Sequence, residues 1–256
     1  MSELRVAVVT GGASGIGAAC VATFIKRGWR VAFSFLGESE RQTAETLLSG
    51  FESSGGSAVA LDCDVRNDEA CRFLARATVE RFGRIDALVC CAGTTRIVPQ
   101  SDLESLTIDD FTTTMAVNTA GVFQTVRACA PALIADEGGA VVIISSYGAI
   151  YGTGSSIAYA ASKGATNTLT MSLARELAPT VRVNAVCPAL VTGGFAQRLD
   201  PDLFRQRVDQ QLSRAPLRKV AHPSDVASDV YWLAAETRLI TGSVILLDCG
   251  LHLTAG

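Results

Sequence analysis

A tyrosine and a lysine four residues apart, Tyr159 and Lys163, are the residues of this sequence best suited to do chemistry. On an α-helix, positions i and i+4 lie on one face, so the phenol and the ammonium would lie side by side. A neighbouring positive charge lowers the pKa of a phenol from about 10 toward neutrality, where it can exchange a proton. Two serines, Ser145 and Ser146, follow the apolar run 141–144 and could place a hydroxyl at the same point.

A glycine-rich segment near the N-terminus is the second feature with a chemical use. The β-branched run 5–9 leads into residues 10–17, which read TGGASGIG, and the pattern after them predicts a helix. This order places phosphates at a helix N-terminus, where free N–H groups and the helix dipole favour negative charge. The spacing differs from the common G-x-G-x-x-G, and an ordinary glycine-rich turn is the alternative interpretation.

Composition and charge exclude several classes of protein. Of 256 residues, 48% are hydrophobic and 18% charged, so the chain can bury a full core. A net charge of -3 gives no electrostatic reason to expect nucleic acid or an anionic membrane as a partner. No apolar run approaches the roughly 18 residues of a membrane span, and no secretory signal begins the sequence. We therefore expect a cytoplasmic protein.

Cysteine and histidine usage indicates neither a disulfide framework nor a metal centre. The 8 cysteines form no C-x-x-C pair and lie mostly in apolar runs, as buried free thiols do. Only 2 histidines are present, which disfavours a zinc site, and we expect no metal.

Predicted strands alternate with predicted helices to the end of the chain. The expected strands are 5–9, 30–35, 58–61, 85–90, 140–144, 181–186 and 243–247. After the first helix, further helices are expected at 38–51 and 67–82, more than one from about 103 to 135, and others at 157–177, 201–211 and 223–235. This alternation predicts an α/β fold, a single-domain, Rossmann-type doubly wound parallel sheet of about seven strands with helices on both faces. We expect one domain over 1–256, with a substrate-loop insertion around 189–215.

Five of the candidate positions follow predicted strand ends. They are the segment 11–17, Asp64, Gly93, Ser146 and Pro188. Because ligands of such sheets lie beyond the carboxyl ends of the strands, we expect these positions to meet at one cleft.

Six motifs in this order resemble the classical short-chain dehydrogenase/reductase family, and the resemblance covers essentially the whole chain. Residues 10–17 are similar to the family's cofactor motif, and Asp64-Val65 to its adenine-contacting pair. Cys90-Cys91-Ala92-Gly93 stands where Asn-Asn-Ala-Gly is usual. The cofactor-binding residues that the resemblance implies are Gly11, Ser14, Gly15, Ile16, Gly17, Phe35, Asp64, Val65, Cys91, Ala92, Gly93, Tyr159, Lys163, Pro188 and Val191.

The resemblance also implies a catalytic tetrad of Ser146, Tyr159, Lys163 and Asn118. The separation of 13 residues between Ser146 and Tyr159 is the usual one, and it selects Ser146 over Ser145. Tyr159 would be the general acid in reduction and the base in oxidation. Lys163 would favour its phenolate and hold the ribose hydroxyls of the cofactor. Ser146 would bind the substrate oxygen, and Asn118 would tie a water to Lys163 in a proton relay.

The cofactor choice depends on the end of the second predicted strand. A carboxylate there would select NAD, but Phe35 occupies the place, and Arg41 or Ser39 could reach a 2′-phosphate. We therefore expect NADP(H) to be favoured over NAD(H). Thr192 lies one residue before the position of the family's carboxamide-binding threonine, so its contact with nicotinamide stays open.

The resulting hypothesis is an oxidoreductase that transfers a hydride between NAD(P)(H) and a carbonyl or secondary alcohol, such as a 3-oxoacyl-type compound or a small ketone. A non-catalytic dinucleotide-binding sensor or scaffold of the same fold is the alternative. The candidate substrate regions are 94–98, 147–151 and 194–214. The last holds Arg198, Arg205, Arg207 and Arg214, which could belong to a lid or to a solvated face, and we infer no acidic substrate from them. The resemblance implies a homo-oligomer, a tetramer or a dimer.

Overall fold

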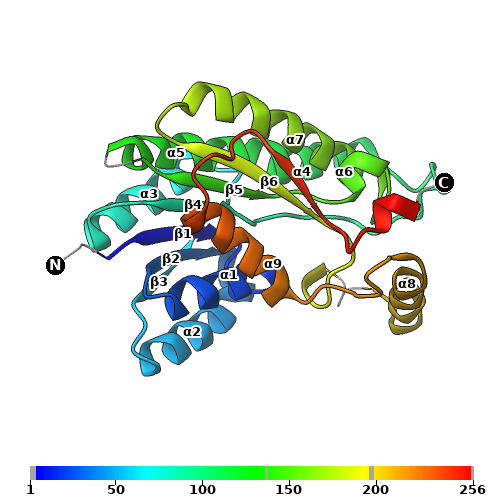
Figure 1. Cartoon of the computed structure of the whole chain (residues 1–256), viewed down its shortest axis with the longest axis horizontal. Coiled ribbons are helices and arrows are strands. Elements are labelled where there is room, and N and C mark those ends of the chain that lie inside the picture. Colours follow the sequence, from blue (N-terminus) through cyan, green and yellow to red (C-terminus); the bar gives the residue numbers. More distant parts are fainter. Residues whose placement is uncertain (1–3, 136–137, 196–198, 255–256) are drawn as a thin grey trace.

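One parallel sheet forms the centre of the molecule (Figure 1). The computed structural model describes residues 4–135, 138–195 and 199–254. The strands are β1 (Val6–Thr10), β2 (Arg30–Phe35), β3 (Ala58–Asp62), β4 (Ala87–Cys90), β5 (Ala140–Ile144), β6 (Arg182–Pro188) and β7 (Val244–Leu247). They lie in the order β3-β2-β1-β4-β5-β6-β7, and all neighbours pair in parallel. The strand order reverses between β1 and β4, which is where ligands of such sheets bind.

Helices cover both faces of this sheet, which confirms the predicted Rossmann-type architecture (Figure 1). On one face lie α3 (Asp68–Phe82), α5 (Gly121–Ala135) and α7 (Ile157–Leu177). On the other lie α1 (Gly15–Lys26), α2 (Gly37–Ser53) and α9 (Pro223–Tyr231). The shorter helices are α4 (Ile108–Met115), α6 (Gly148–Tyr151) and α8 (Pro201–Arg214).

The sheet is largely apolar because both of its faces are covered. In β1, Val6 and Val8 pack against the layer of α3, α5 and α7, whereas Ala7 and Val9 pack against the opposite layer. All four side chains are fully buried. A strand with two buried faces needs a continuous apolar run, and this requirement made the strands recognisable in the sequence.

The helices predicted from about 103 to 135 are α4 and α5, and the first of them starts later than expected. Thr107 ends the preceding turn, since its hydroxyl accepts the N–H of Asp110 at 3.3 Å. The Asp110 carboxylate in turn accepts the N–H of Thr107 at 2.8 Å, so the pair forms a capping box that fixes the start of α4. A π-helical turn over Ala116–Ala120 then joins α4 to α5 and carries Asn118.

Two expectations from the sequence concern buried free thiols and membrane spans. All eight cysteines are free, six of them buried and two partly buried. Within the described ranges, no helix has the length and apolar character needed to cross a membrane.

Candidate functional site

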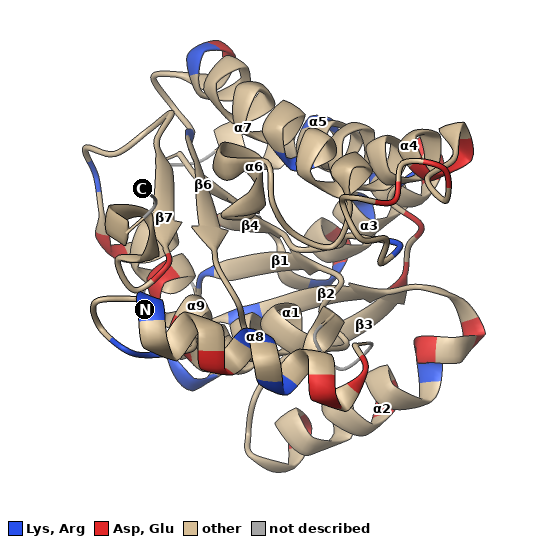
Figure 2. Cartoon of the chain, turned by 90° about the vertical axis from the view of Figure 1, so that its right-hand side faces the viewer, with Lys and Arg blue, Asp and Glu red and all other residues tan. Residues whose placement is uncertain are grey.

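A cavity of about 1000 Å³ opens beyond the carboxyl ends of the strands. Figure 2 looks onto this end of the molecule, where α8 lies in front of the sheet. The predicted site residues that line the cavity are Gly11, Ser14, Gly15, Ile16, Cys91, Ala92, Gly93, Ser146, Tyr159, Lys163, Pro188 and Val191. Those that lie outside its lining are Gly17, Phe35, Asp64, Val65 and Asn118. Segments far apart in the sequence therefore meet at one cleft.

The glycine-rich segment forms a cradle that side chains would fill. Gly11 has a φ of 63° and Gly15 a φ of 53°, a left-handed conformation that favours glycine. A Cβ on Gly11 would lie 2.8 Å from the Cα of Ala92, and one on Gly17 would overlap the carbonyl oxygen of Gly11. Ser14 takes the N-cap position of α1, but its side chain makes no capping hydrogen bond. The helix start thus suits a bound phosphate.

Thr10 steadies the loop in which two cysteines replace the family's asparagines. Its hydroxyl accepts the N–H of Cys91 at 3.1 Å and the N–H of Ala92 at 3.2 Å. These bonds tie the end of β1 to the loop after β4, without any side-chain amide. Burial raises the pKa of the Cys91 thiol to about 11, so this sulfur is neutral at physiological pH.

The two neighbouring serines after β5 face different partners. The Ser145 hydroxyl donates to Oδ1 of Asn167 at 2.6 Å and is buried. The Ser146 hydroxyl accepts the N–H of Gly148 at 3.1 Å, and it lies close enough to the Tyr159 phenol to lower the pKa of that group. The serine that the resemblance selects is thus the one whose hydroxyl lies beside the phenol, and its catalytic role stays a prediction.

Tyr159 and Lys163 lie in the first two turns of α7, one helical turn apart. Ser156 begins this helix, since its hydroxyl accepts the N–H of Tyr159 at 3.2 Å. The Lys163 ammonium donates to the carbonyl oxygen of Ile144 at 2.7 Å, and its Nζ lies 5.8 Å from the centre of the Tyr159 ring. The backbone of β5 therefore fixes the lysine beneath the phenol.

The expected lowering of the phenol pKa is wrong for this structure. Burial raises the pKa of Tyr159 to about 12, although the ring is partly open to the cavity and the hydrogen bond from Ser146 acts in the opposite direction. Burial also lowers the pKa of Lys163 to about 8. Removal from water disfavours the charged form of each group, and the ammonium is directed at the Ile144 carbonyl. The sequence shows the spacing of the pair but not its desolvation.

Asn118 lies behind the cavity wall. Its Oδ1 accepts the N–H of Thr94 at 2.8 Å, and its Nδ2 donates to the Thr94 carbonyl and to the Ser162 hydroxyl, both at 3.0 Å. The side chain is fully buried. It thus joins the loop after β4 to α7, and its predicted part in a proton relay stays a prediction.

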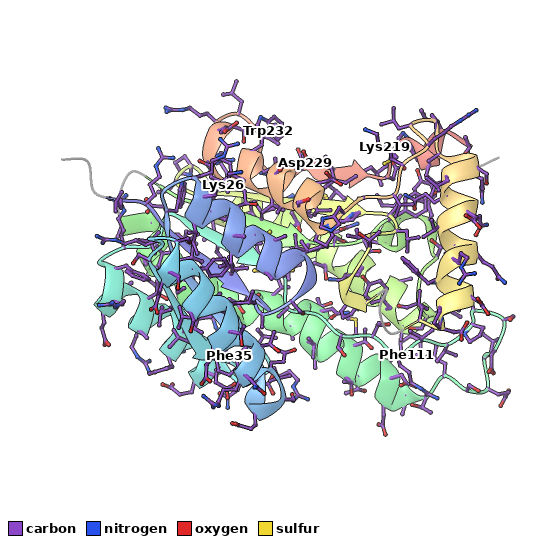
Figure 3. The ribbon with its side chains drawn as sticks, turned by 90° about the horizontal axis from the view of Figure 1, so that it is seen from below. Lys26, Phe35, Phe111, Lys219, Asp229 and Trp232 are labelled. Atoms are coloured by element: carbon purple, nitrogen blue, oxygen red, sulfur yellow. The ribbon has the colours of Figure 1, made fainter. Side chains whose placement is uncertain are left out.

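The predicted adenine and ribose contacts also lie outside the cavity lining. Asp64 is paired with Arg66 at 2.6 Å, and the Val65 carbonyl accepts a hydrogen bond from Gln124 at 3.0 Å. Phe35 is buried, and the guanidinium carbon of Arg41 lies 5.3 Å from the centre of its ring. Figure 3 shows Phe35 beside α2, on the side of the molecule away from α8.

Several cavity residues were not among the predicted site residues. Thr192 is the most informative, because its hydroxyl is buried and has no hydrogen-bond partner among the described residues. Tyr147 and Tyr151 stack with ring centres 4.3 Å apart and an interplanar angle of 21°. Glu40 also lines the cavity. The position of Thr192 just after β6 could have identified it from the sequence. Nothing in the sequence marks Glu40 as a cavity residue beyond its place near a helix start.

Comparison with known proteins agrees with this geometry. A family model described as Enoyl-(Acyl carrier protein) reductase matches residues 11–252. A 3-oxoacyl-[acyl-carrier-protein] reductase FabG from Thermotoga maritima is 33% identical over 97% of this chain and 98% of its own length. A 2-(R)-hydroxypropyl-CoM dehydrogenase from Xanthobacter autotrophicus is 34% identical over 95% of this chain and 97% of its own.

Solved structures show the same likeness. A protein from Burkholderia xenovorans described as a short-chain dehydrogenase/reductase superposes with a TM-score of 0.90 at 40% identity, over 99% of this chain and 100% of that one. An actinorhodin polyketide ketoreductase variant with NADPH gives a TM-score of 0.87 at 29% identity, over 97% of each chain. The chain belongs to the classical short-chain dehydrogenase/reductase family. It is an oxidoreductase that transfers a hydride between NAD(P)(H) and a carbonyl or alcohol group.

Proposed function

We propose that this enzyme reduces the carbonyl group of a 3-oxoacyl-type compound or a small ketone, with Tyr159, Ser146 and Lys163 as its catalytic residues. The observation that carries the proposal is the meeting of three groups at one cavity wall. The Ser146 hydroxyl lies close enough to the Tyr159 phenol to lower its pKa, and the Lys163 ammonium is fixed next to them. The ketoreductases and the 3-oxoacyl reductase among its relatives support the direction and the substrate class.

The cofactor side of the cavity fits a dinucleotide. The glycine cradle leaves space for the pyrophosphate at the start of α1, and the unpaired hydroxyl of Thr192 suits a carboxamide. The predicted contacts at Ser14, Ile16, Pro188 and Val191 line the same cavity. When bound, the nicotinamide supplies or accepts the hydride.

Tyr159 is suited to donate a proton to the carbonyl oxygen. A pKa of about 12 keeps the phenol protonated at neutral pH, which is the form that an acid needs. The Ser146 hydroxyl can donate a hydrogen bond to the same oxygen, where negative charge develops. The Lys163 ammonium stabilises the phenolate that remains. Alcohol oxidation uses the same groups in reverse, with the phenolate as the base.

Asn118 acts in this proposal as a positioning residue. Its bonds to Thr94 and Ser162 hold the loop after β4 against α7, which carries Tyr159 and Lys163. Loss of the amide would loosen the cavity wall without removing a group from it.

The proposed cofactor is NADP(H) rather than NAD(H). The end of β2 presents Phe35 in place of a carboxylate, and the Arg41 guanidinium lies over its ring. The Arg41 side chain is held by Glu38 at 2.7 Å and is partly exposed, so a 2′-phosphate can compete for it. Paired titrations of the two cofactors test this preference, and NAD(H) binding at least about tenfold tighter would contradict it.

The proposal also covers assembly and location. Partly exposed apolar side chains on α4, α5 and α7, namely Met115, Phe123 and Met171, support a homo-oligomer, a tetramer or a dimer, formed through these helices. The free thiols suit a reducing compartment and support a cytoplasmic location. That 1–256 form a single domain stays a prediction.

A panel of ketones, 3-oxoacyl thioesters and secondary alcohols tests the function. Each compound is incubated with the enzyme and either cofactor, and the reduced-nicotinamide absorbance is followed. We expect turnover of at least one carbonyl class. Tight cofactor binding without turnover of any member would favour the alternative, a non-catalytic dinucleotide sensor or scaffold.

A further inference from the structure

The wall of the cavity formed by α8 carries positive charge that no carboxylate of the described residues pairs with. Arg207 and Arg214 both line the cavity, and they are two helical turns apart on one face of α8. Neither has an ion pair or hydrogen bond within the described residues. Arg205 differs, because it pairs with Asp202 at 3.6 Å and does not line the cavity. Arg198 lies outside the described residues.

A buried glutamine fixes this face of α8 toward the cavity. The Oε1 of Gln211 accepts the N–H of Leu190 at 3.1 Å, and its Nε2 donates to the Lys219 carbonyl at 2.9 Å. Its side chain is 5% exposed. Gln211 lies four residues after Arg207 and three before Arg214, so all three share one helix face. The anchor therefore places both arginines at the cavity, where Arg207 is half-buried and Arg214 exposed. Figure 2 shows charged residues of both signs along α8.

Among the described residues that line the cavity, no carboxylate on the α8 side is left to neutralise them. Among the described lining residues the single acid is Glu40, beside β2, and it accepts the N–H of Leu36 at 2.9 Å. Asp248 lies behind the wall, where it binds the His252 ring at 2.8 Å and the N–H of Gly250 at 3.0 Å. A guanidinium that faces a cavity and lacks a partner is suited to an anion.

An aromatic and aliphatic lining lies next to the arginines. Tyr147 and Tyr151 stack on each other and line the cavity together with Leu190. Burial raises the pKa of Tyr147, the charges of Tyr151 and Asp248 add to this rise, and the charge of Arg214 opposes it, so both Arg214 and Asp248 lie within electrostatic reach of this ring. An apolar stretch of substrate can therefore cross this lining between the catalytic hydroxyls and the arginines.

We propose that the substrate carries an anionic group, a carboxylate or a phosphate-like group, which Arg207 and Arg214 bind while its carbonyl meets Ser146 and Tyr159. This inference rests on the proposed function of the same cavity. It assigns α8 a specificity role that the sequence left open, and it defines a class of substrate, oxo acids with an apolar segment between the two groups.

The test is a ladder of oxo acids of increasing chain length, each paired with its neutral methyl ester, with matched oxo phosphonates as a further arm. We expect kcat/KM of the wild-type enzyme to favour the acid by about tenfold to hundredfold at one chain length, because a hydrogen bond to a charged group is worth about 1.5–3 kcal/mol. The difference should lie mainly in KM. The phosphonates show which anion the arginines prefer.

The double variant Arg207→Gln, Arg214→Gln should turn over acid and ester with similar efficiency, whereas the control Arg205→Gln should keep the preference. Equal turnover of acid and ester by the wild-type enzyme would overturn the inference and leave the proposed function intact. Weakening of cofactor affinity by about tenfold in the double variant would also overturn it, since the arginines would then serve the cofactor.

Calorimetric binding of the acids to the cofactor-loaded enzyme separates the two proposals. Suppose that the wild-type enzyme binds an acid, that the double variant does not, and that no carbonyl is turned over. This result would support the anion site and contradict the proposed reduction. No binding of any acid or phosphonate would overturn the anion site.

Discussion

Two parts of the cavity are held in opposite ways. We call the part next to the sheet, with Ser146, Tyr159 and Lys163, its floor, and the part formed by α8, with Arg207 and Arg214, its outer wall. On the floor, Lys163 is 4% exposed and bonds the backbone of β5. On the wall, Arg207 and Arg214 have no partner among the described residues, and a single buried side chain, Gln211, holds their helix. The proposed catalytic groups are thus fixed by the sheet, whereas the proposed anion-binding groups have no protein partner among the described residues and are free to bind a ligand.

Burial of the ionisable groups on the floor costs free energy. Burial shifts the pKa of Tyr159 upward and that of Lys163 downward, so both groups lose hydration in their charged forms. The wall residues stay in contact with water. Substitutions on the floor should therefore change rate or stability, depending on the group removed, and substitutions on the wall should change selectivity.

The largest effect is expected for Gly17→Ala, on the cofactor side of the floor. The new Cβ would overlap the Gly11 carbonyl oxygen, so the cradle must distort. We expect destabilisation of about 2–4 kcal/mol in thermal or denaturant unfolding, and no measurable cofactor binding.

The matched control is Gly50→Ala in α2, where an added Cβ meets nothing within 4 Å. Because alanine favours a helix over glycine, this variant should be more stable by about 0.5–1 kcal/mol and should bind cofactor normally. Normal cofactor affinity in Gly17→Ala would show that the cradle is not the binding site.

The two serines after β5 allow a comparison of a proposed catalytic residue with a structural one on the floor. Ser146→Ala should lower kcat by about 10²–10³-fold with little loss of stability, because it removes a donor to the developing charge. Ser145→Ala removes the bond to Asn167 instead, so it should cost about 1 kcal/mol of unfolding free energy and change kcat little. Steady-state kinetics and denaturant unfolding of both variants decide the assignment, and the reverse pattern would exchange their roles.

The pH dependence of reduction should follow Lys163. Its pKa of about 8 lies below the ordinary value, so the ammonium is present below that pH and is lost above it. Tyr159 stays protonated over the same range, since its pKa is about 12. We expect kcat/KM for reduction to fall with rising pH above about 8, approaching a tenfold loss per pH unit. A profile that is flat up to pH about 10 would contradict the role of the ammonium.

The smallest effect is expected at the rim of the cofactor site. Arg41→Ala should weaken NADP(H) binding by about fivefold to tenfold and leave NAD(H) binding nearly unchanged, because an exposed ion pair contributes about 1 kcal/mol. Fluorescence titration of the reduced cofactors measures both affinities. An equal change in affinity for the two cofactors would show that Arg41 does not bind the 2′-phosphate.

Backbone requirements made much of the fold predictable from the sequence. The apolar runs of β1 and β5 and the glycines at 11, 15 and 17 follow from double burial and from close backbone approach, which restrict residue type directly. The predicted bounds of β5 and α7 agree with the structure. The start of α4 was missed because its capping box at Thr107 lies inside a stretch that is otherwise compatible with a helix.

Tertiary environment made the rest unpredictable. The sequence places Tyr159 and Lys163 together, but the direction of the phenol pKa shift depends on how much water the fold removes. The spacing of the arginines in α8 is likewise the same as that of arginines on a solvated helix face, so the sequence does not show which of them face the cavity. The contacts of Gln211 with Leu190 and Lys219, which join distant segments, determine the face that turns inward.

The most direct test of the central claim is a comparison of Tyr159→Phe with the wild-type enzyme in carbonyl reduction and in cofactor titration. Because the ring is kept and only the acid is lost, we predict a fall in kcat of at least about 10³-fold with unchanged cofactor affinity. Turnover of the variant within about tenfold of the wild type would show that the phenol of Tyr159 is not the proton donor.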